Sequence, residues 1–427
     1  MGMIKPIDPI PIYSVIKELS NYKLIIRGDE KMDTYESELK KLRTLFEQGI
    51  YKPDFYSKKL HDITQLDNYD SFKNIPFTYK WEIRKSSVEE RTTTQSKDIY
   101  GVFSSSGTTG EKTYYIYNKN DKHVHEEFVK TFYTELGIKE EDVGGVMAPI
   151  DTTVMAHTMM WQFTTMGAGY VNCPTPSPEN MIDTVTKVPV TVIATRPSIA
   201  SGVAYNPVLK KMAQASKVNK LLMGGGFLSC ERRKLLEEAW HAECYNMFGM
   251  SEMFGPMAGE CKQKNGLHYL NQYLMIEIVD PDSGRPVAKG NPGVAVYTTL
   301  WDKGFPLLRY WTDDVMILTD DKCECGSCLP RLFYLGRLND CFKTEKGYIF
   351  PENVENILFK YGNIGEYRVE KHNDIYIVKT EGNEKNCNVD MLSKLNDLFG
   401  AVVEVEVVIP GSLNYDGHSK RFSDDTQ

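Results

Sequence analysis

A run of hydroxyl and glycine residues between two β-prone segments has the composition of a loop that binds phosphate groups. The run reads SSSGTTGEKT, and its candidate contacts are Ser104, Ser105, Ser106, Gly107, Thr108, Thr109 and Gly110. Glycine lets the chain turn tightly, so that backbone amides and hydroxyl groups can wrap a polyphosphate. The run lacks the lysine placement of a Walker-type loop, which argues against a P-loop kinase. A plain solvated turn is the alternative.

Four further motifs follow this run along the chain. They are MGGG at 223–226, YNMFGMSE at 245–252, LLRYWTDDV at 307–315 and LGRLNDCFKTEKGYIFPENVE at 335–355. In this order, and over nearly the whole chain, they resemble the motifs of the adenylate-forming superfamily in its phenylacetate-CoA ligase-like branch. The resemblance implies an enzyme that uses ATP and Mg²⁺ to turn a carboxylic acid into an acyl-adenylate and then into a thioester.

The resemblance also assigns the nucleotide contacts. Glu252 would offer a hard oxygen ligand to Mg²⁺, although alone it would also suit a helix start. Asp314 would accept both ribose hydroxyls, and Arg337 would contact ribose or phosphate. Trp311 and Asp313 stand where the family has an arginine and a glycine, so we expect a different local loop. The adenine side would be formed by Gly224, Gly225, Gly226, Tyr245, Asn246, Met247, Phe248, Gly249, Met250 and Ser251.

The catalytic lysine of the family is the point where this chain departs from the pattern. In the family a C-terminal lysine bridges the substrate carboxylate and the α-phosphate, but here His418 falls at its position and Lys420 two residues later. Either Lys420 substitutes through a shifted loop, or His418 does so more weakly, or adenylation is slowed; we favour Lys420, because a full positive charge stabilises the transition state best. The resemblance makes Asp340 a hinge and Lys343 a contact of the thioester-forming state.

Cysteine spacing predicts a structural zinc site. CECGSC supplies Cys323 and Cys325, with Cys328 in reserve, and Cys261 and His268 stand upstream in ECKQKNGLH. Four soft ligands from two segments can form a closed tetrahedral Zn²⁺ site with no open position for catalysis. Some members of the resembled branch carry a similar pattern. Unliganded surface thiols are the alternative.

By analogy with the resembled family, the acid is expected to bind between the apolar segment TVMAHTMMWQFTTMGAGY and the Gly224 to Gly226 segment. Met155, His157 and Trp161 are the candidate lining residues, with Met160 and Phe163 beside them. Their apolar and aromatic character favours an aryl or medium-sized apolar acid. A core helix with one satisfied histidine is the competing interpretation.

The element pattern predicts an α/β protein with a large N-terminal, multi-sheet domain at 1–340 and a small C-terminal lid at 341–427. Residues 1–98 are expected to be helical, 99–272 to form β-α units with a parallel sheet, and 273–335 to form an antiparallel β region. After Gly336 the alternation of strands and helices is typical of a small, mobile ferredoxin-like α+β domain.

Composition limits the partners. A net charge of -8 over 427 residues disfavours nucleic acid, and no apolar run is long enough to span a membrane. Without an export or lipidation pattern, a cytoplasmic protein is expected, and a homodimer is compatible with the sequence. The thiol acceptor is coenzyme A or, second, the phosphopantetheine arm of a carrier protein. A degenerate, non-catalytic nucleotide-binding protein is the alternative of another class.

Overall fold

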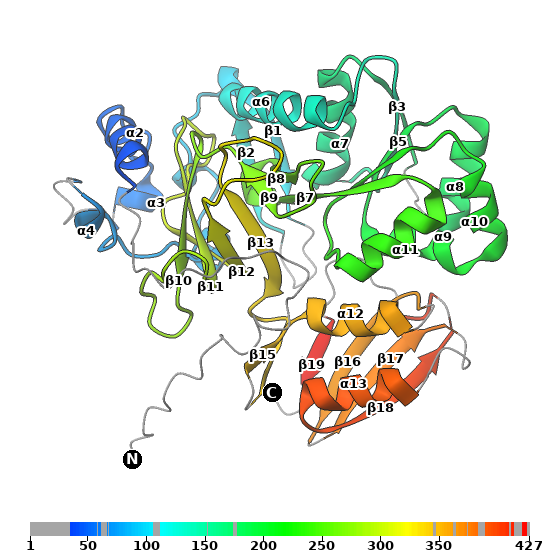
Figure 1. Cartoon of the computed structure of the whole chain (residues 1–427). Helices are drawn as coiled ribbons and strands as arrows, with labels where there is room; N and C mark the ends of the chain where they lie inside the picture. Colours follow the sequence, from blue (N-terminus) through cyan, green and yellow to red (C-terminus); the bar gives the residue numbers. More distant parts are fainter. Residues whose placement is uncertain are drawn as a thin grey trace, which may run out of the picture.

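Figure 1 shows the computed structural model of the chain. It describes residues 35–57, 59–60, 66, 68–105, 112–151, 153–173, 177–344, 347–361, 364–373, 375–382, 389–409, 411–413 and 421–424. Ser106 to Gly110, His418 and Lys420 lie outside the described residues.

One mixed sheet of eleven strands runs through the large part of the molecule, in the order β10-β11-β12-β13-β9-β8-β7-β6-β5-β3-β4. Its parallel half consists of short strands, of which the inner ones are apolar runs buried on both faces and the edge strand is more exposed. These strands are β3 (Val143–Met147), β4 (Gly169–Asn172), β5 (Val192–Thr195), β6 (Lys220–Met223) and β7 (Glu243–Met250).

The other half of the sheet is antiparallel and begins within β7, which pairs in parallel with β6 and then antiparallel with β8. The change of sheet class therefore precedes residue 273, where the sequence predicted it, and the two regions share one sheet. Its strands are β8 (Gly255–Glu260), β9 (Leu267–Tyr269), β10 (Leu274–Val279), β11 (Pro292–Thr299), β12 (Tyr310–Thr319) and β13 (Arg331–Arg337).

Helices cover both faces of the parallel half. Val192 and Ala194 of β5 face a core shared with α6 and α7, whereas Ile193 faces a core shared with the remaining helices, as the two-residue period of a strand requires. Several helices begin at side-chain caps, such as Asn118, Ser177 and Ser229. The helices are α6 (Lys119–Glu135), α7 (Val154–Thr165), α8 (Pro178–Lys187), α9 (Pro197–Tyr205), α10 (Pro207–Gln214) and α11 (Cys230–Trp240).

Short helices and a hairpin precede this sheet and pack on its antiparallel half (Figure 1). The helices are α2 (Glu36–Glu47), α3 (Asp54–Ser57), α4 (Tyr69–Phe72), α5 (Lys80–Lys85), and the 3-10 turns Glu89–Arg91 and Ser96–Asp98. The hairpin consists of β1 (Ile99–Ser104) and β2 (Tyr114–Asn118). Among the described residues no helix is long and apolar enough to cross a membrane.

The C-terminal unit has its own core and its own four-stranded sheet, in the order β18-β17-β16-β19. β17 and β18 pair directly and in parallel, whereas a split β-α-β unit would place a strand between them; the ferredoxin-like part of the prediction is therefore not confirmed. Its elements are β14 (Phe342–Thr344), β15 (Gly347–Ile349), α12 (Pro351–Tyr361), β16 (Tyr367–His372), β17 (Ile375–Glu381), α13 (Val389–Phe399), β18 (Val402–Val408) and β19 (Phe422–Asp424).

Four buried charges join this unit to α11, which lies directly above α12 in Figure 1. Arg232 of α11 lies 3.5 Å from Glu355 and 3.0 Å from Glu366. Arg421 lies 3.4 Å and 3.0 Å from the same two carboxylates. The two positive and two negative charges balance, which is the condition under which such groups can be buried.

Candidate active site

A cavity of about 770 Å³ opens at the carboxyl ends of β5, β6 and β7, where open α/β sheets bind ligands. β12, β13, α5 and α7 also contribute to its wall. Four residues of the linker and the C-terminal unit reach it as well: Asn339, Asp340, Pro351 and Arg421. Most of the predicted nucleotide contacts that the structure describes line this cavity.

The two ends of the predicted phosphate loop meet at this cavity. The Ser105 amide donates to the Thr113 carbonyl oxygen at 2.8 Å, and the Thr113 amide donates to Ser105 Oγ at 3.1 Å. Ser105 lines the cavity, whereas Ser104, the last residue of β1, is buried and does not line it. These bonds hold the ends of the loop together at the site.

The glycines after β6 line the cavity as predicted. The Gly224 amide donates to the Thr195 carbonyl oxygen at 3.0 Å, which extends the pairing of β5 and β6 by one residue. Gly225 adopts a φ of 68°, in the left-handed region, and a Cβ there would lie 3.0 Å from the Met155 side chain. A larger residue at this position would be strained and would crowd the wall.

The aromatic motif divides between the cavity and the core. Asn246, Met247, Phe248, Gly249, Met250 and Ser251 line the cavity. Tyr245 does not line it: two residues before Met247 on the same face of β7, its ring packs in the α6–α7 core, away from the predicted place beside adenine. Phe248 instead packs 5.2 Å from Tyr334, whose ring lies 5.8 Å from Phe227. Gly249 is required by β8, since a Cβ would lie 2.2 Å from the Gly255 carbonyl oxygen.

Glu252 places a buried carboxylate at the cavity. Its Oε1 accepts hydrogen bonds from the hydroxyls of Tyr115 and Tyr310, each at 3.1 Å, and lies 3.1 Å from Lys80 Nζ. Burial alone would raise the pKa of this group, but the Lys80 charge and the hydrogen bonds outweigh it and hold the pKa at about 2. Glu252 is therefore ionised at neutral pH, as a Mg²⁺ ligand must be.

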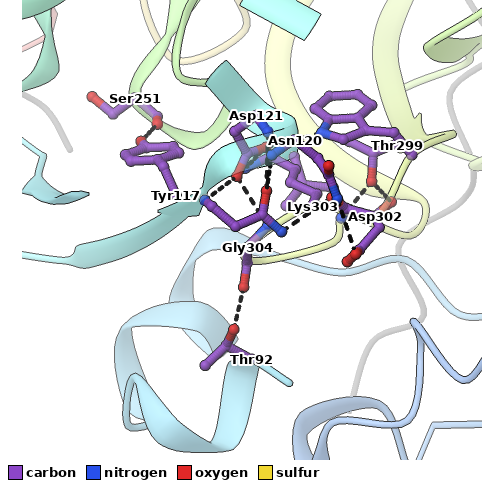
Figure 2. A network of polar contacts seen from close by, with 12 residues as sticks. Thr92, Tyr117, Asn120, Asp121, Ser251, Thr299, Asp302, Lys303 and Gly304 are labelled. Atoms are coloured by element: carbon purple, nitrogen blue, oxygen red, sulfur yellow. Dashed lines mark hydrogen bonds and ion pairs between the residues drawn. The ribbon is translucent and has the colours of Figure 1, made fainter. Parts of the chain in front are cut away.

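A polar network fixes the residue that precedes Glu252 (Figure 2). The Tyr117 hydroxyl donates to the Ser251 carbonyl oxygen, and Lys303 Nζ lies 4.9 Å from the Tyr117 ring centroid. Asp121, at the start of α6, accepts from the Gly304 amide at 3.0 Å and lies 3.8 Å from Lys303. β2, α6 and the 302–304 turn thus set the position of the segment that carries the carboxylate.

Asp314 and Arg337 face each other across the β12–β13 pair at the cavity. Asp314 is buried, with Arg337 Nε 3.3 Å from its Oδ1. Burial raises the pKa of Asp314, and the Arg337 charge opposes that rise. Asp313 takes the position of the family glycine with a φ of 63° and accepts a 2.7 Å hydrogen bond from Trp311 Nε1. Trp311 and Asp313, which stand where the family has an arginine and a glycine, therefore stabilise the same turn.

The predicted acid-binding helix, α7, turns a different face to the cavity from the one expected. Met155, Thr158, Met159 and Gln162 line the cavity, a spacing typical of one helix face. His157 and Trp161 lie on the opposite face. Trp161 stacks on Tyr100 at 4.9 Å, and the Tyr100 hydroxyl lies 3.2 Å from His157 Nε2. These two residues belong to an aromatic cluster below the site, which corrects their predicted role.

The predicted hinge and the predicted contact of the thioester-forming state lie in different places. Asp340 lines the cavity, and its Oδ1 accepts from the amides of Arg421 and Phe422 at 2.9 and 3.0 Å. Lys343 is exposed on β14, 5.6 Å from the Tyr348 ring centroid, and does not line the cavity. The bonds to Asp340 tie the start of β19 to the linker between the two parts of the molecule.

The four predicted zinc ligands come together. The candidate ligand atoms of Cys261, His268, Cys323 and Cys325 all lie within 4.8 Å of one another. Cys261 and Cys323 sulfurs are 3.8 Å apart, close to the edge of about 3.8 Å that tetrahedral geometry gives for Zn–S bonds of about 2.3 Å. His268 Nδ1 lies 3.0 Å from the Leu329 carbonyl oxygen, which orients Nε2 toward the sulfurs. Cys328 is exposed and outside the group.

Several cavity residues were not predicted. Lys80 belongs to a helix whose sequence, KWEIRK, looks like an ordinary charged surface. Tyr133 lies in a core-like run of α6, and Gln162 stands among apolar residues of α7, where its polarity was the one available signal. Tyr334 stands three residues before Arg337 in β13.

The chain is similar to a known family of enzymes. The family model described as AMP-binding enzyme matches residues 16–298, and the chain therefore belongs to this family. This match supports the predicted resemblance to adenylate-forming enzymes. The similar proteins support the phenylacetate-CoA ligase-like branch of that superfamily.

Phenylacetate-coenzyme A ligase of Thermus thermophilus is 28% identical over 74% of this chain and 75% of its own length. The Escherichia coli enzyme of the same name is 22% identical over 85% of this chain and 87% of its own. A 2-hydroxyisobutyryl-CoA ligase in its postadenylation state has a TM-score of 0.78 at 20% identity, covering 99% of this chain and 94% of that one; its thioesterification-state structure scores 0.64 at 21% identity, covering 91% and 89%. The expected AMP-forming ligase of this branch is confirmed.

Proposed function

We propose that the protein is an ATP-dependent acid-thiol ligase that forms an acyl-AMP with release of pyrophosphate and then a thioester with release of AMP. One observation carries the proposal: a single cavity brings together the ionised Glu252, the buried Asp314 with Arg337, and the closed ends of the serine-rich loop. In this scheme Glu252 holds Mg²⁺, Asp314 binds the ribose hydroxyls, and Arg337 neutralises Asp314 and the nearby phosphate. Bound Mg²⁺ would supply charge stabilisation at the phosphates.

The acid is proposed to be aryl or medium-sized and mainly apolar. Met155, Met159, Leu222 and Met247 line the cavity and offer an apolar wall. Coenzyme A is the proposed acceptor, in keeping with the names of the relatives, and a carrier-protein phosphopantetheine arm is the alternative because it presents the same thiol. We further propose a cytoplasmic protein that binds neither nucleic acid nor membrane; a homodimer is compatible with this proposal.

The unit from residue 341 is proposed to be a mobile lid that turns about Asp340 after adenylation. Two features support this. Asp340 lies in the linker at the cavity, and the higher TM-score against the postadenylation state than against the thioesterification state agrees with an arrangement of the two parts in which Lys343 stays away from the site. Rotation would exchange the C-terminal loop for the Lys343 face.

Acid-dependent exchange of pyrophosphate into ATP tests the proposed reaction and its lysine. We expect exchange with at least one acid of an aryl and aliphatic panel, and a fall of about 100-fold or more in Lys420→Ala, because a charge that stabilises the transferring α-phosphoryl group is lost. His418→Ala is the matched control and should retain most of the exchange. Loss in His418→Ala alone would assign the role to histidine, whereas absence of exchange with every acid would favour a non-catalytic nucleotide-binding protein.

The cysteine and histidine group is proposed to hold a structural Zn²⁺ that joins the β8–β9 turn to the β12–β13 loop. We expect one zinc per chain by elemental analysis, and a loss of about 3–5 kcal/mol in the free energy of unfolding for Cys261→Ser, since a closed metal site stabilises the folded state directly. Cys328→Ser, outside the group, should change neither zinc content nor melting temperature. Zinc-free wild-type protein with an unaltered melting temperature would contradict the proposal.

A further inference from the structure

The wall of the cavity contains a buried polar pair in a mainly apolar region. Tyr133 of α6 and Gln162 of α7 both line the cavity and are 0% and 2% exposed. The Tyr133 hydroxyl donates to Gln162 Oε1. Gln162 Nε2 is buried and makes no hydrogen bond to any residue that the structure describes. Since a buried amide without a partner is costly, this group requires an explanation.

The surplus of donors at this pair does not depend on how the amide is oriented. Tyr133 brings one hydrogen and Gln162 brings two, and the bond between them uses one of the three. If the amide were turned by 180°, Nε2 would donate to the phenol oxygen and the phenol hydrogen would be left over, together with one amide hydrogen. In both orientations the pair keeps unused hydrogens; in the orientation that the structure shows, both of them lie on Nε2, so an acceptor completes the amide.

The surroundings indicate that this acceptor is neutral. Met159 lines the same face of α7 one turn before Gln162, and Ala194, Leu222 and Met247 complete the wall. Arg196 also lines the cavity, but it lies beside Gly225 and Met155, and Met155 is about 10 Å from Gln162 along the helix axis. A carboxylate at Gln162 would thus be buried without a counter-ion close by, which is strongly unfavourable.

We propose that Gln162 is a specificity-determining residue that selects acids carrying a neutral hydrogen-bond acceptor, such as a hydroxyl, carbonyl or ether oxygen, on the part remote from the carboxylate. The inference rests on the proposed ligase function and names its substrate class. An acid of the same shape without the acceptor would leave the amide unpaired. We therefore expect discrimination of at least about tenfold in kcat/KM, and more if the acceptor is held in good geometry.

Matched acid pairs test this in the wild-type enzyme. The pairs are 4-methoxyphenylacetate with 4-ethylphenylacetate, and 5-oxohexanoate with 5-methylhexanoate; each replaces an acceptor oxygen by carbon at similar volume. Pyrophosphate release should favour the oxygen-bearing acid of at least one pair by about tenfold or more in kcat/KM. Equal values, preference for the carbon analogue, or preference for the dicarboxylate adipate would overturn the inference while leaving the ligase function intact. No release with any acid would instead remove the proposed function.

The variant Gln162→Leu then assigns the preference to its residue. The ratio of kcat/KM within the favoured pair should fall toward one, because leucine keeps the volume but has no donor. Thr164→Ala is the matched control on the same helix, since Thr164 is exposed and does not line the cavity, and it should keep the wild-type ratio. An unchanged ratio in a folded Gln162→Leu protein would exclude Gln162 as the residue responsible; if that variant does not fold, the wild-type pairs still decide the substrate class.

Discussion

Replacing Glu252 by glutamine is expected to lower acid-dependent ATP–pyrophosphate exchange by about 100- to 1,000-fold. Glutamine keeps the size of the side chain and can still accept from Tyr115 and Tyr310, but it removes the negative charge that a pKa of about 2 maintains at neutral pH. It also leaves Lys80 facing an uncharged amide. The remaining activity should require a higher Mg²⁺ concentration, which a titration of exchange against Mg²⁺ measures.

Two control variants separate the metal role from other effects. Glu47→Gln removes an exposed carboxylate of α2 far from the cavity and should leave both rate and Mg²⁺ dependence unchanged. Tyr115→Phe removes one of the hydrogen bonds to Glu252 and should cost far less than loss of the charge. Exchange by Glu252→Gln at the wild-type rate, with an unaltered Mg²⁺ requirement, would rule out Glu252 as a metal ligand.

The motifs with special backbone or charge requirements were the predictable part of this site. The backbone at Gly225 has a positive φ, which favours glycine, and the cavity requires charged side chains at Asp314 and Arg337. These requirements restrict the residue type at each position, so they leave a recognisable pattern in the sequence. The same holds for the cysteine and histidine spacing, because a metal site needs four soft ligands within a few ångströms. The order of these motifs also predicted the family.

The sequence did not predict which face of α7 and of β7 lines the cavity. Neither element separates its polar and apolar residues onto opposite faces, so the periodicity does not reveal which side meets the ligand and which side meets the core. Trp161 and Tyr245 were placed at the site for their chemistry, but packing against α6 and its neighbours decides their positions. Lys80 reaches Glu252 from a distant segment, a contact set by tertiary structure alone.

Arg232→Met is expected to lower the free energy of unfolding by about 3–5 kcal/mol. In the wild type, Arg232 and Arg421 balance Glu355 and Glu366, and all four side chains are buried or nearly so. Without Arg232, two buried carboxylates face one guanidinium. Thermal and urea unfolding measure the change. Lys234→Met is the control: the Lys234 side chain is exposed and pairs with Glu231 on the same helix, so its loss should shift stability by no more than about 0.5 kcal/mol.

The double variant Arg232→Met, Glu366→Leu tests whether charge balance is the cause. It removes one charge of each sign and leaves Arg421 with Glu355, 3.4 Å apart. If the imbalance of charge destabilises the single variant, the double variant should recover a large part of the lost stability, although it lacks one more ion pair. If the lost contacts themselves are what matter, the two losses will add.

The same cluster joins α11 to the C-terminal unit, so a lid that rotated about Asp340 would have to break it. We expect protease to cleave the 338–341 linker faster in the single variant than in the wild type. The double variant, in which the buried charges balance again, should be cleaved more slowly than the single variant.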